Sequence, residues 1–174
     1  MRLPFYRLMA FFALYFLTAF VISGEVEHPT TDALSGYIEK HCRSNCVDPA
    51  ALHFGVEAVA NELDVNPVVL LAIIRVESNF RTKAVNTKNG KSAGLMQIQV
   101  RWHKEKFRGK NHLDIMDNLR VGAMVYRDCA RKHKGSREKA LLCYNGYQKN
   151  GMKIYVPKVL QAYKELEQIN LRFG

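Results

Sequence analysis

The chain has 174 residues, of which 48% are hydrophobic, and this composition excludes an intrinsically disordered protein and indicates one domain. Lys and Arg total 26 against 16 Asp and Glu, which gives a formal net charge of +10. That balance excludes an acidic, solvating chain. It favours an anionic partner, which could be nucleic acid, an acidic membrane surface or an anionic polymer.

An apolar stretch at residues 8–22 dominates the N-terminal end of the chain. Arg2 and Arg7 precede it and a Ser-Gly pair follows it, which is the order of a secretory signal peptide. The stretch has about 15 residues, fewer than the roughly 20 residues that a membrane-spanning helix needs. We therefore expect residues 1–24 to be a signal peptide, or an uncleaved N-terminal anchor, of a protein exported to the periplasm or the cell envelope.

Four cysteines, Cys42, Cys46, Cys129 and Cys143, fit an exported protein with disulfide bonds. Four cysteines allow three pairings. The local option joins Cys42 to Cys46 and Cys129 to Cys143, whereas crossed pairings would tie the N-terminal segment to the rest of the chain. A zinc site needs tighter ligand pairs, and His41 is the only histidine close by, so we expect no metal site.

The region after the expected signal contains the helix-start residues that are typical of a compact helical domain. Thr31-Asp32 can open a short helix that runs to about His41. Asp48-Pro49 and Asn66-Pro67 each combine an N-cap residue with proline at the first helical position. The run 68–76 after the second of these caps is apolar except for one arginine, which predicts a central buried helix.

The second half of the chain continues this helical pattern after a loop, which the polar, aperiodic composition of residues 81–93 predicts. No run with strand-like alternation is longer than about five residues, so the fold class is mainly α. The later helices are expected to open at Asp117 or Asn118 and end at Gly135, to run from Ser136 to about Tyr144, and, after a loop at 145–151, to cover 156–166.

Glu77 has an unusual position in the central helix. Leu70, Ile73 and Ile74 form one apolar face, and Glu77 is the next member of that face, near the helix C-terminus. Burial and the negative helix end would both raise the pKa of its carboxyl. A carboxyl that stays protonated near neutral pH suits general-acid cleavage of a glycosidic bond. Taken alone, this position more often belongs to a structural glutamate that pairs with an arginine.

Four motifs in a fixed order change this interpretation. Residues 72–80 read AIIRVESNF, 92–98 read SAGLMQI, 140–146 read ALLCYNG and 155–159 read YVPKV. This order resembles the soluble lytic transglycosylase (SLT) domain family, a branch of the lysozyme-like superfamily that includes goose-type lysozyme. The resemblance covers roughly residues 60–170. It implies a single lysozyme-like helical domain with a substrate cleft.

The resemblance also implies roles for particular residues. Glu77 matches the catalytic acid of the family, and Ser78 matches a serine that helps to fix the end of its helix. The hydroxyl of Tyr144 is expected close to the catalytic carboxyl, where it can orient it, and Tyr155 is also expected to face the cleft. The expected substrate-binding residues are Ser78, Asn86 (with Ser92 as the alternative), Gly94, Leu95, Met96, Gln97, Tyr144, Asn145 and Tyr155.

Within the groove motif, Gln97 is expected to offer its amide to sugar groups and Met96 an adaptable apolar contact. Just past the motif, Trp102 could stack on a sugar, but a single tryptophan in an α domain is more often part of the core, so Trp102 is expected in the core. One departure from the family pattern is Cys143, which stands where the family usually has Ala. If it forms a disulfide, that bridge is expected directly behind the cleft.

The stretch 78–104 contains no Asp or Glu. Two-carboxylate glycosidases need a second Asp or Glu, whereas the family's lytic reaction needs only Glu77 as acid and then base, without a cofactor. The expected product is a 1,6-anhydromuramoyl sugar. Two alternatives stay open: lysozyme-type hydrolysis, and a non-catalytic wall-binding module of a secretion or pilus assembly.

The expected organisation has three parts: residues 1–24 as the signal or anchor, 25–60 as an N-terminal helical extension, and 61–174 as the lytic transglycosylase domain. The expected partners are peptidoglycan glycan strands and a cell-envelope machine for secretion, pilus assembly or conjugation. Nucleic acid is not expected, because the basic residues are scattered and no binding motif is present. Membrane contact is expected only with an uncleaved N-terminal segment.

Overall fold

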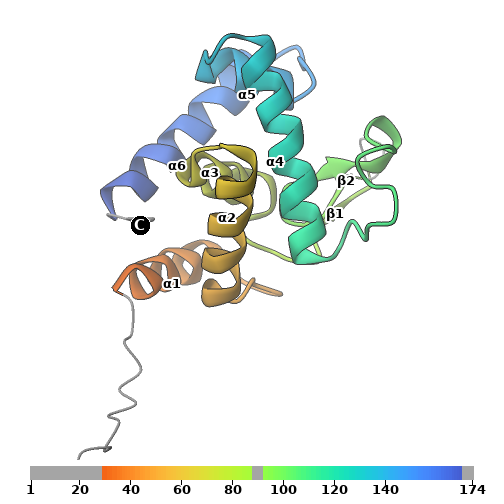
Figure 1. Ribbon diagram of the computed structural model, residues 1–174. Coiled ribbons are helices and arrows are strands. Elements are labelled where there is room, and N and C mark those ends of the chain that lie inside the picture. Colours follow the sequence, from red (N-terminus) through yellow and green to blue (C-terminus); the bar gives the residue numbers. More distant parts are fainter. Residues whose placement is uncertain (1–28, 88–91, 170–174) are drawn as a thin grey trace, which may run out of the picture.

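The computed structural model describes residues 29–87 and 92–169, so the signal expected at 1–24 lies outside the described residues (Figure 1). Within this part the fold is mainly α, as the sequence predicts, with one small sheet. The helices are α1 (Pro29–His41), α2 (Pro49–Leu63), α3 (Pro67–Ser78), α4 (Ile115–Lys132), α5 (Arg137–Tyr144) and α6 (Val156–Gln168).

The two predicted cap-and-proline devices open α2 and α3. Asp48 accepts a hydrogen bond from the backbone N–H of Ala51 at 2.7 Å, with Pro49 at the start of the helix. Asn66 accepts from the first free N–H groups of α3, one of them at 2.8 Å. Both side chains satisfy donors that a helix leaves without intrahelical partners, which is why these helices begin where the sequence predicts.

The start of α4 differs from the prediction. The helix is capped by Asp114, whose carboxylate accepts from the N–H of Asp117 at 2.9 Å, so Asp117 and Asn118 lie inside the first turn. Asn118 is 1% exposed, and its side chain forms tertiary hydrogen bonds instead of capping the helix. Its side chain accepts from Met96 N at 2.8 Å and donates to Ala93 O at 3.0 Å. A polar residue that suits an N-cap is therefore used to hold a distant loop.

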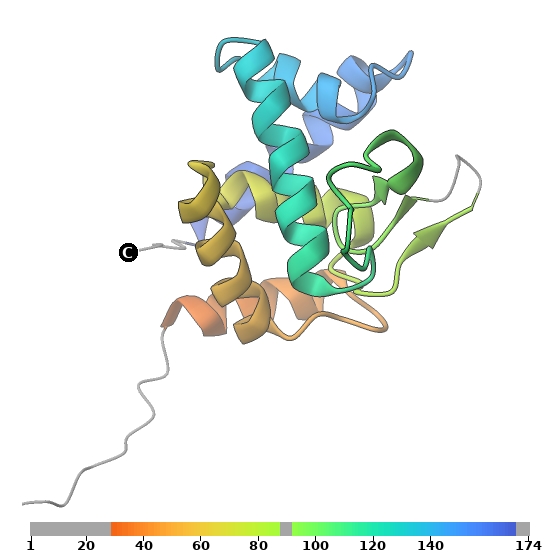
Figure 2. The same cartoon turned by 45° about the vertical axis from the view of Figure 1, so that its right-hand side comes forward.

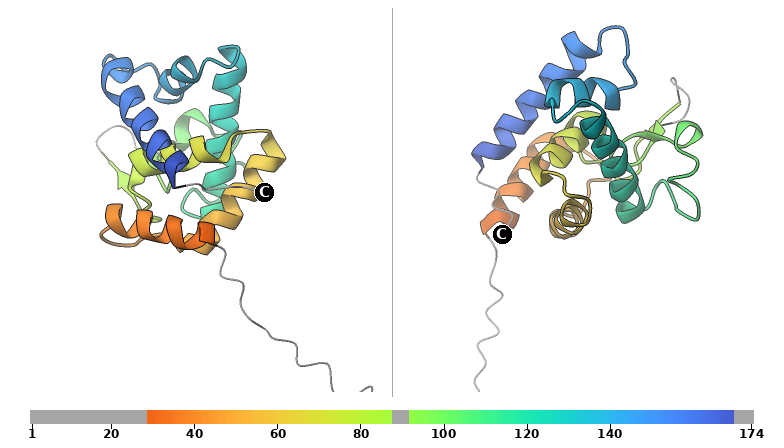
Figure 3. Two further views of the ribbon diagram at one scale, coloured as in Figure 1. Left: turned by 90° about the vertical axis from the view of Figure 1, so that its left-hand side faces the viewer. Right: turned by 45° about the horizontal axis from the view of Figure 1, so that its top comes forward.

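Helix α3 lies in the middle of the molecule, with α2, α4 and α6 around it (Figure 1). Its apolar residues 69–74 are almost fully buried, and they join one hydrophobic cluster with residues of α1, α2, α4, α5 and α6. The C-terminal part of α6 lies near α1 (Figure 3), where the Tyr37 hydroxyl donates to the Glu165 carboxylate at 2.8 Å. A rigid core therefore surrounds the helix that carries Glu77.

A small antiparallel sheet interrupts the region predicted as loop. It consists of β1 (Val85–Asn86), β2 (Ser92–Ala93) and β3 (Ile98–Gln99), paired in that order, and it lies beside α4 (Figure 2). Strands of two residues carry no detectable alternation, so sequence periodicity could not show them. A short 3₁₀-helix, η1 (Val100–Trp102), and a π-helical turn, η2 (Gly151–Tyr155), complete the described elements.

Both disulfides follow the local pairing: Cys42 bonds to Cys46, and Cys129 bonds to Cys143. The second bridge joins α4 to α5, and the first closes the turn between α1 and α2. None of the helices in the described ranges has the length and apolar character that crossing a membrane requires.

Candidate active site

Glu77 lies in the last turn of α3, and the end of this helix is firmly fixed. Asn79 adopts the left-handed conformation (φ 51°) and its N–H bonds to the carbonyl of Arg75, which closes the helix. The Ser78 hydroxyl donates to Ile74 O at 3.1 Å and the residue is 1% exposed. Ser78 thus fixes the helix end, but its expected contact with substrate is wrong because the side chain is buried and turned into the helix.

The Glu77 carboxyl is half-buried in a protein environment that disfavours its charged form. Burial raises its pKa from 4.5 to about 7, and a hydrogen bond from Tyr155 partly opposes this rise. That bond runs from the Tyr155 hydroxyl to Oε1 at 2.7 Å. Among the described residues, no Lys, Arg or His forms an ion pair with Glu77. A substantial fraction of the carboxyl therefore keeps its proton near neutral pH.

The tyrosine that orients Glu77 is not the one predicted. The Tyr144 hydroxyl donates to Met96 O at 2.8 Å rather than to the carboxyl. It nevertheless lines the same hollow as Glu77. Burial and then the charge on Glu77 raise the pKa of Tyr144 well above its usual range. Tyr155, at the end of η2, holds the carboxyl instead. Sequence order alone could not distinguish the two hydroxyls, since both motifs follow the groove motif.

The groove motif acts mainly as structural support. Leu95 and Met96 are 1% and 0% exposed, so the prediction that they contact substrate is wrong: both pack into the core. Gly94 has φ +77°, and a Cβ there would collide with the Asn118 side chain and meet the His112 carbonyl at 2.6 Å. Only glycine fits this close approach of two loops.

Gln97 lines the cleft, but its amide is already engaged. Its Nε2 donates to Ala84 O and to Gly94 O, both at 2.9 Å, and its Oε1 accepts from the Ser92 hydroxyl at 3.2 Å. Both amide N–H groups are used within the protein, which leaves the second lone pair of Oε1 as the group that Gln97 can offer to a sugar. Gln97 ties β2 to the segment before β1 and so shapes the floor of the cleft.

Two hollows meet at Glu77 and form one cleft. The first, of about 550 Å³, is called the basic hollow, and the second, of about 590 Å³, the aromatic hollow. They share Glu77, Asn86 and Gln97, so the carboxyl lies between them. The remaining lining of the basic hollow is Ser44, Asn45, Arg81, Lys83, Ala84, Val85 and Thr87. That of the aromatic hollow includes Ser92, Arg101, Trp102, His103, Cys129, Cys143, Tyr144, Asn145, Tyr147 and Gln148.

The predicted residues Asn86 and Asn145 lie in this cleft, at the junction and in the aromatic hollow respectively. Two aromatic side chains of the hollow escaped prediction. Trp102 is 70% exposed, not part of the core as expected, and Tyr147 is 48% exposed. Arg101 stacks on Trp102, with its guanidinium carbon 4.8 Å from the ring centre. Exposed aromatic faces in a cleft are suited to stack on sugar rings.

Among the described residues that line the two hollows, Glu77 is the only Asp or Glu. The Cys129–Cys143 bridge lies in the wall of the aromatic hollow, as the position of Cys143 predicts. No three or more His, Cys, Asp or Glu side chains group into a potential metal site within residues 29–87 and 92–169.

A mainly α domain whose cleft centres on one protonatable carboxyl has the architecture of the lysozyme-like, glycan-cleaving proteins. The family model described as "Transglycosylase SLT domain" matches residues 56–155, and the chain belongs to this family. Its general activity is therefore of the peptidoglycan lytic transglycosylase type, with peptidoglycan as the substrate. Neither a curated protein nor a solved structure gives a significant match.

Proposed function

We propose that this protein cleaves the β-1,4 bond between N-acetylmuramic acid and N-acetylglucosamine and releases a 1,6-anhydromuramoyl product. The observation that supports this most strongly is Glu77, a carboxyl with a pKa of about 7 between two hollows whose other described lining residues include no Asp or Glu. A glycan strand that lies along the cleft would carry its scissile bond past this carboxyl.

Glu77 acts twice in the proposed reaction. Its protonated carboxyl first donates the proton to the glycosidic oxygen, and the bond from that oxygen to the anomeric carbon breaks. The C6 hydroxyl oxygen of the same muramoyl sugar then bonds to the anomeric carbon, and its proton passes to the Glu77 carboxylate. The carboxyl is restored, and atoms and charges balance without water. The nucleophile belongs to the substrate, so proximity replaces activation by a second carboxylate.

Tyr155 supports both steps. Its hydroxyl donates to Oε1 of Glu77 at 2.7 Å, which leaves Oε2 to exchange the proton with the substrate. The same bond stabilises the carboxylate that exists between the two steps. Because Tyr155 is 9% exposed and its hydroxyl is held against Glu77, it fixes the direction in which the carboxyl points.

Hydrolysis of the lysozyme type is disfavoured by the lining of the cleft. A hydrolase needs a second carboxylate, roughly 5–10 Å from the first, as nucleophile or as base for water. The side chains around Glu77 are instead neutral or basic, with Arg81 and Lys83 on one side and Arg101 on the other.

Analysis of the digestion products tests this proposal. Purified murein is digested with the protein, and the soluble muropeptides are separated and weighed. We expect anhydro products, each one water lighter than the hydrolytic product, and no reducing ends. Reducing products would overturn the transglycosylase assignment, whereas products that a Glu77→Gln variant also releases would overturn the role of Glu77.

We also propose that the protein works outside the cytoplasm. The two disulfides support this, because such bonds persist in oxidising compartments, and the signal-like pattern at 1–24 agrees with it. Cell fractionation followed by mass measurement of the N-terminus is the test. Recovery of the full chain from the cytosol, with reduced cysteines, would refute it.

A further inference from the structure

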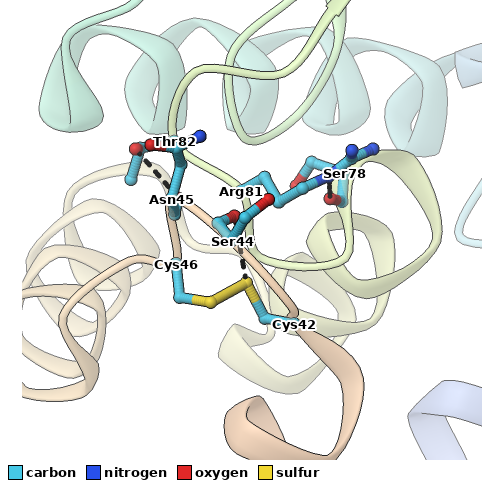
Figure 4. The surroundings of a disulfide bond; sticks show 7 residues. All are labelled: Cys42, Ser44, Asn45, Cys46, Ser78, Arg81 and Thr82. Atoms are coloured by element: carbon cyan, nitrogen blue, oxygen red, sulfur yellow. Dashed lines mark hydrogen bonds between the residues drawn. A yellow bond between two sulfur atoms is a disulfide. The ribbon is translucent and has the colours of Figure 1, made fainter.

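A short disulfide loop outside the matched family region forms part of the cleft. Residues 42–46 precede the match at 56–155, yet Ser44 and Asn45 line the basic hollow together with Glu77 and Arg81. Figure 4 shows the loop beside Ser78, Arg81 and Thr82. The sequence alone does not predict that Ser44 and Glu77 line one hollow, because more than thirty positions separate them.

The loop is attached to the segment that follows Glu77 by several backbone bonds. Cys46 forms a β-bridge with Arg81, and the N–H of Val47 donates to Phe80 O at 2.8 Å. Thr82 donates to Asn45 O from its N–H at 3.0 Å and from its hydroxyl at 3.2 Å (Figure 4). The Cys42–Cys46 bond closes the loop from the other side. Ser44 and Asn45 are therefore held in place at the edge of the hollow.

The charge in this hollow is basic and is not neutralised by neighbours. Arg81 and Lys83 are exposed, and neither forms an ion pair with a described residue. The Nε of Arg81 donates to Ser78 O at 2.9 Å, which fixes the guanidinium while no described hydrogen bond uses its two terminal nitrogens. A fixed guanidinium with a free pair of N–H donors matches a carboxylate in a two-bond geometry.

We propose that Ser44 and Asn45 of the disulfide loop, together with Arg81 and Lys83, form a carboxylate-binding subsite beside Glu77. This proposal rests on the proposed function and extends it to substrate selection. The ligand is a carboxylate of the glycan strand. It comes either from the lactyl group of N-acetylmuramic acid or from a stem peptide attached to that group. Arg81 and Lys83 supply the charge, and Ser44 and Asn45 supply neutral polar groups at the rim.

Binding to a Glu77→Gln variant tests the subsite without turnover. Three probes are titrated calorimetrically at one fixed salt concentration: peptide-bearing glycan oligomers, peptide-free oligomers with free lactyl carboxylates, and neutral N-acetylglucosamine oligomers. Adding Arg81→Gln is expected to weaken binding of a carboxylate-bearing probe about tenfold, which is the size expected for a charged hydrogen-bonded pair. Binding of the neutral oligomer is expected to stay within a factor of two.

The first two probes separate the two sources of the carboxylate. A loss confined to the peptide-bearing oligomer assigns the subsite to the stem peptide, and a loss confined to the peptide-free oligomer assigns it to the lactyl group. An equal loss on all three probes, or a loss on none, overturns the proposal. Lys139→Gln, which removes one exposed positive charge from α5 outside the cleft, is the matched control and should leave all three affinities unchanged.

The loop is tested by a Cys42→Ser/Cys46→Ser double variant in the same Glu77→Gln background. We expect a selective loss of about threefold or more on the carboxylate-bearing probe, with thermal unfolding confirming that the domain is folded at the assay temperature. A loss of affinity on the neutral probe as well would overturn the role of the loop. If the proposed function itself were wrong, the result would differ from failure of the subsite, because the wild-type chain would release no anhydro product from murein.

Discussion

The two hollows on either side of Glu77 share that carboxyl, Asn86 and Gln97, but the rest of their linings differ in chemical character. The basic hollow carries Arg81 and Lys83 and has no aromatic side chain among its described lining residues, whereas the aromatic hollow exposes Trp102 and Tyr147. The contrast indicates a division of labour along the cleft: charge is recognised on one side of the scissile bond and sugar faces on the other.

The hollows are also built from different parts of the chain, but each is bordered by one disulfide. The Cys42–Cys46 loop borders the basic hollow, and Cys129–Cys143 lies in the wall of the aromatic hollow. Glu77 itself belongs to the buried helix α3, which is part of the core cluster. The recognition surfaces can therefore vary in sequence around a carboxyl whose position is fixed by core packing.

The largest effect is expected where the two hollows meet. Glu77→Gln should lower murein lysis by at least about a thousandfold, because no other described residue that lines either hollow carries a carboxyl to take over proton transfer. Release of anhydro muropeptides over time is the measurement, with circular dichroism as the control for folding. Residual activity within tenfold of the wild type would mean that another group supplies the proton.

Substitutions of Tyr155 and Tyr144 are expected to distinguish the tyrosine that orients the Glu77 carboxyl from the one that bonds to the groove motif. The proton donor must be protonated, so lytic activity should fall as the pH rises through the Glu77 pKa of about 7. The Tyr155 bond lowers that pKa, so Tyr155→Phe should move the alkaline limb to higher pH and reduce kcat about tenfold. Tyr144→Phe, which loses a bond to Met96 O, should leave the limb in place. Equal shifts in both pH profiles would contradict this assignment.

The aromatic hollow is expected to act through contact rather than charge. Trp102→Ala should weaken glycan binding to a Glu77→Gln variant about fivefold to tenfold, a size comparable to other stacking contacts of exposed aromatic rings. Unlike Arg81→Gln, it should weaken neutral and carboxylate-bearing oligomers alike. The unfolding temperature should not change, because the side chain is 70% exposed. A loss of affinity restricted to carboxylate-bearing oligomers would contradict the assignment of charge recognition to the basic hollow alone.

The disulfides are expected to differ in their contributions to stability. Cys129 and Cys143 are 14 residues apart, and removing their bond should cost about 3 kcal/mol in the loop-entropy model. Cys42 and Cys46 are only 4 residues apart, so removing theirs should cost about 2 kcal/mol. Denaturant unfolding of the two double Cys→Ser variants measures both values. If removal of the Cys42–Cys46 bond cost more stability, native contacts rather than loop closure would dominate the contribution of the disulfides.

A second effect on stability concerns the cost of burying the catalytic carboxyl. Its pKa is raised in the folded state, so the folded protein binds more protons than the unfolded chain between pH 4.5 and about 7, and its stability falls as pH rises through that window. Glu77→Gln removes this loss. The variant should be more stable than the wild type above pH 7, by on the order of 2 kcal/mol after allowance for partial exposure. Equal unfolding curves at pH 8 would contradict it.

Much of the architecture could be predicted because it rests on local physics. The caps at Asp48 and Asn66 act through side chains on their own helices, and the apolar face that leads to Glu77 is a helical repeat. The sequence predicts the start of α4 at Asp117 or Asn118, but Asp114 caps the helix, and the Asn118 side chain is committed to the groove motif instead.

The amino-acid sequence by itself determined the helical class, the family and the one carboxyl on an apolar helix face, since periodicity, capping and ordered motifs are properties of neighbouring residues. The tertiary structure decided which groups meet that carboxyl. Tyr155 reaches Glu77 from 78 residues away, Met96 turns into the core, and the loop at 42–46 joins the cleft through Arg81. These contacts depend on how the helices pack, and no local pattern encodes which of several similar side chains a packed core brings together.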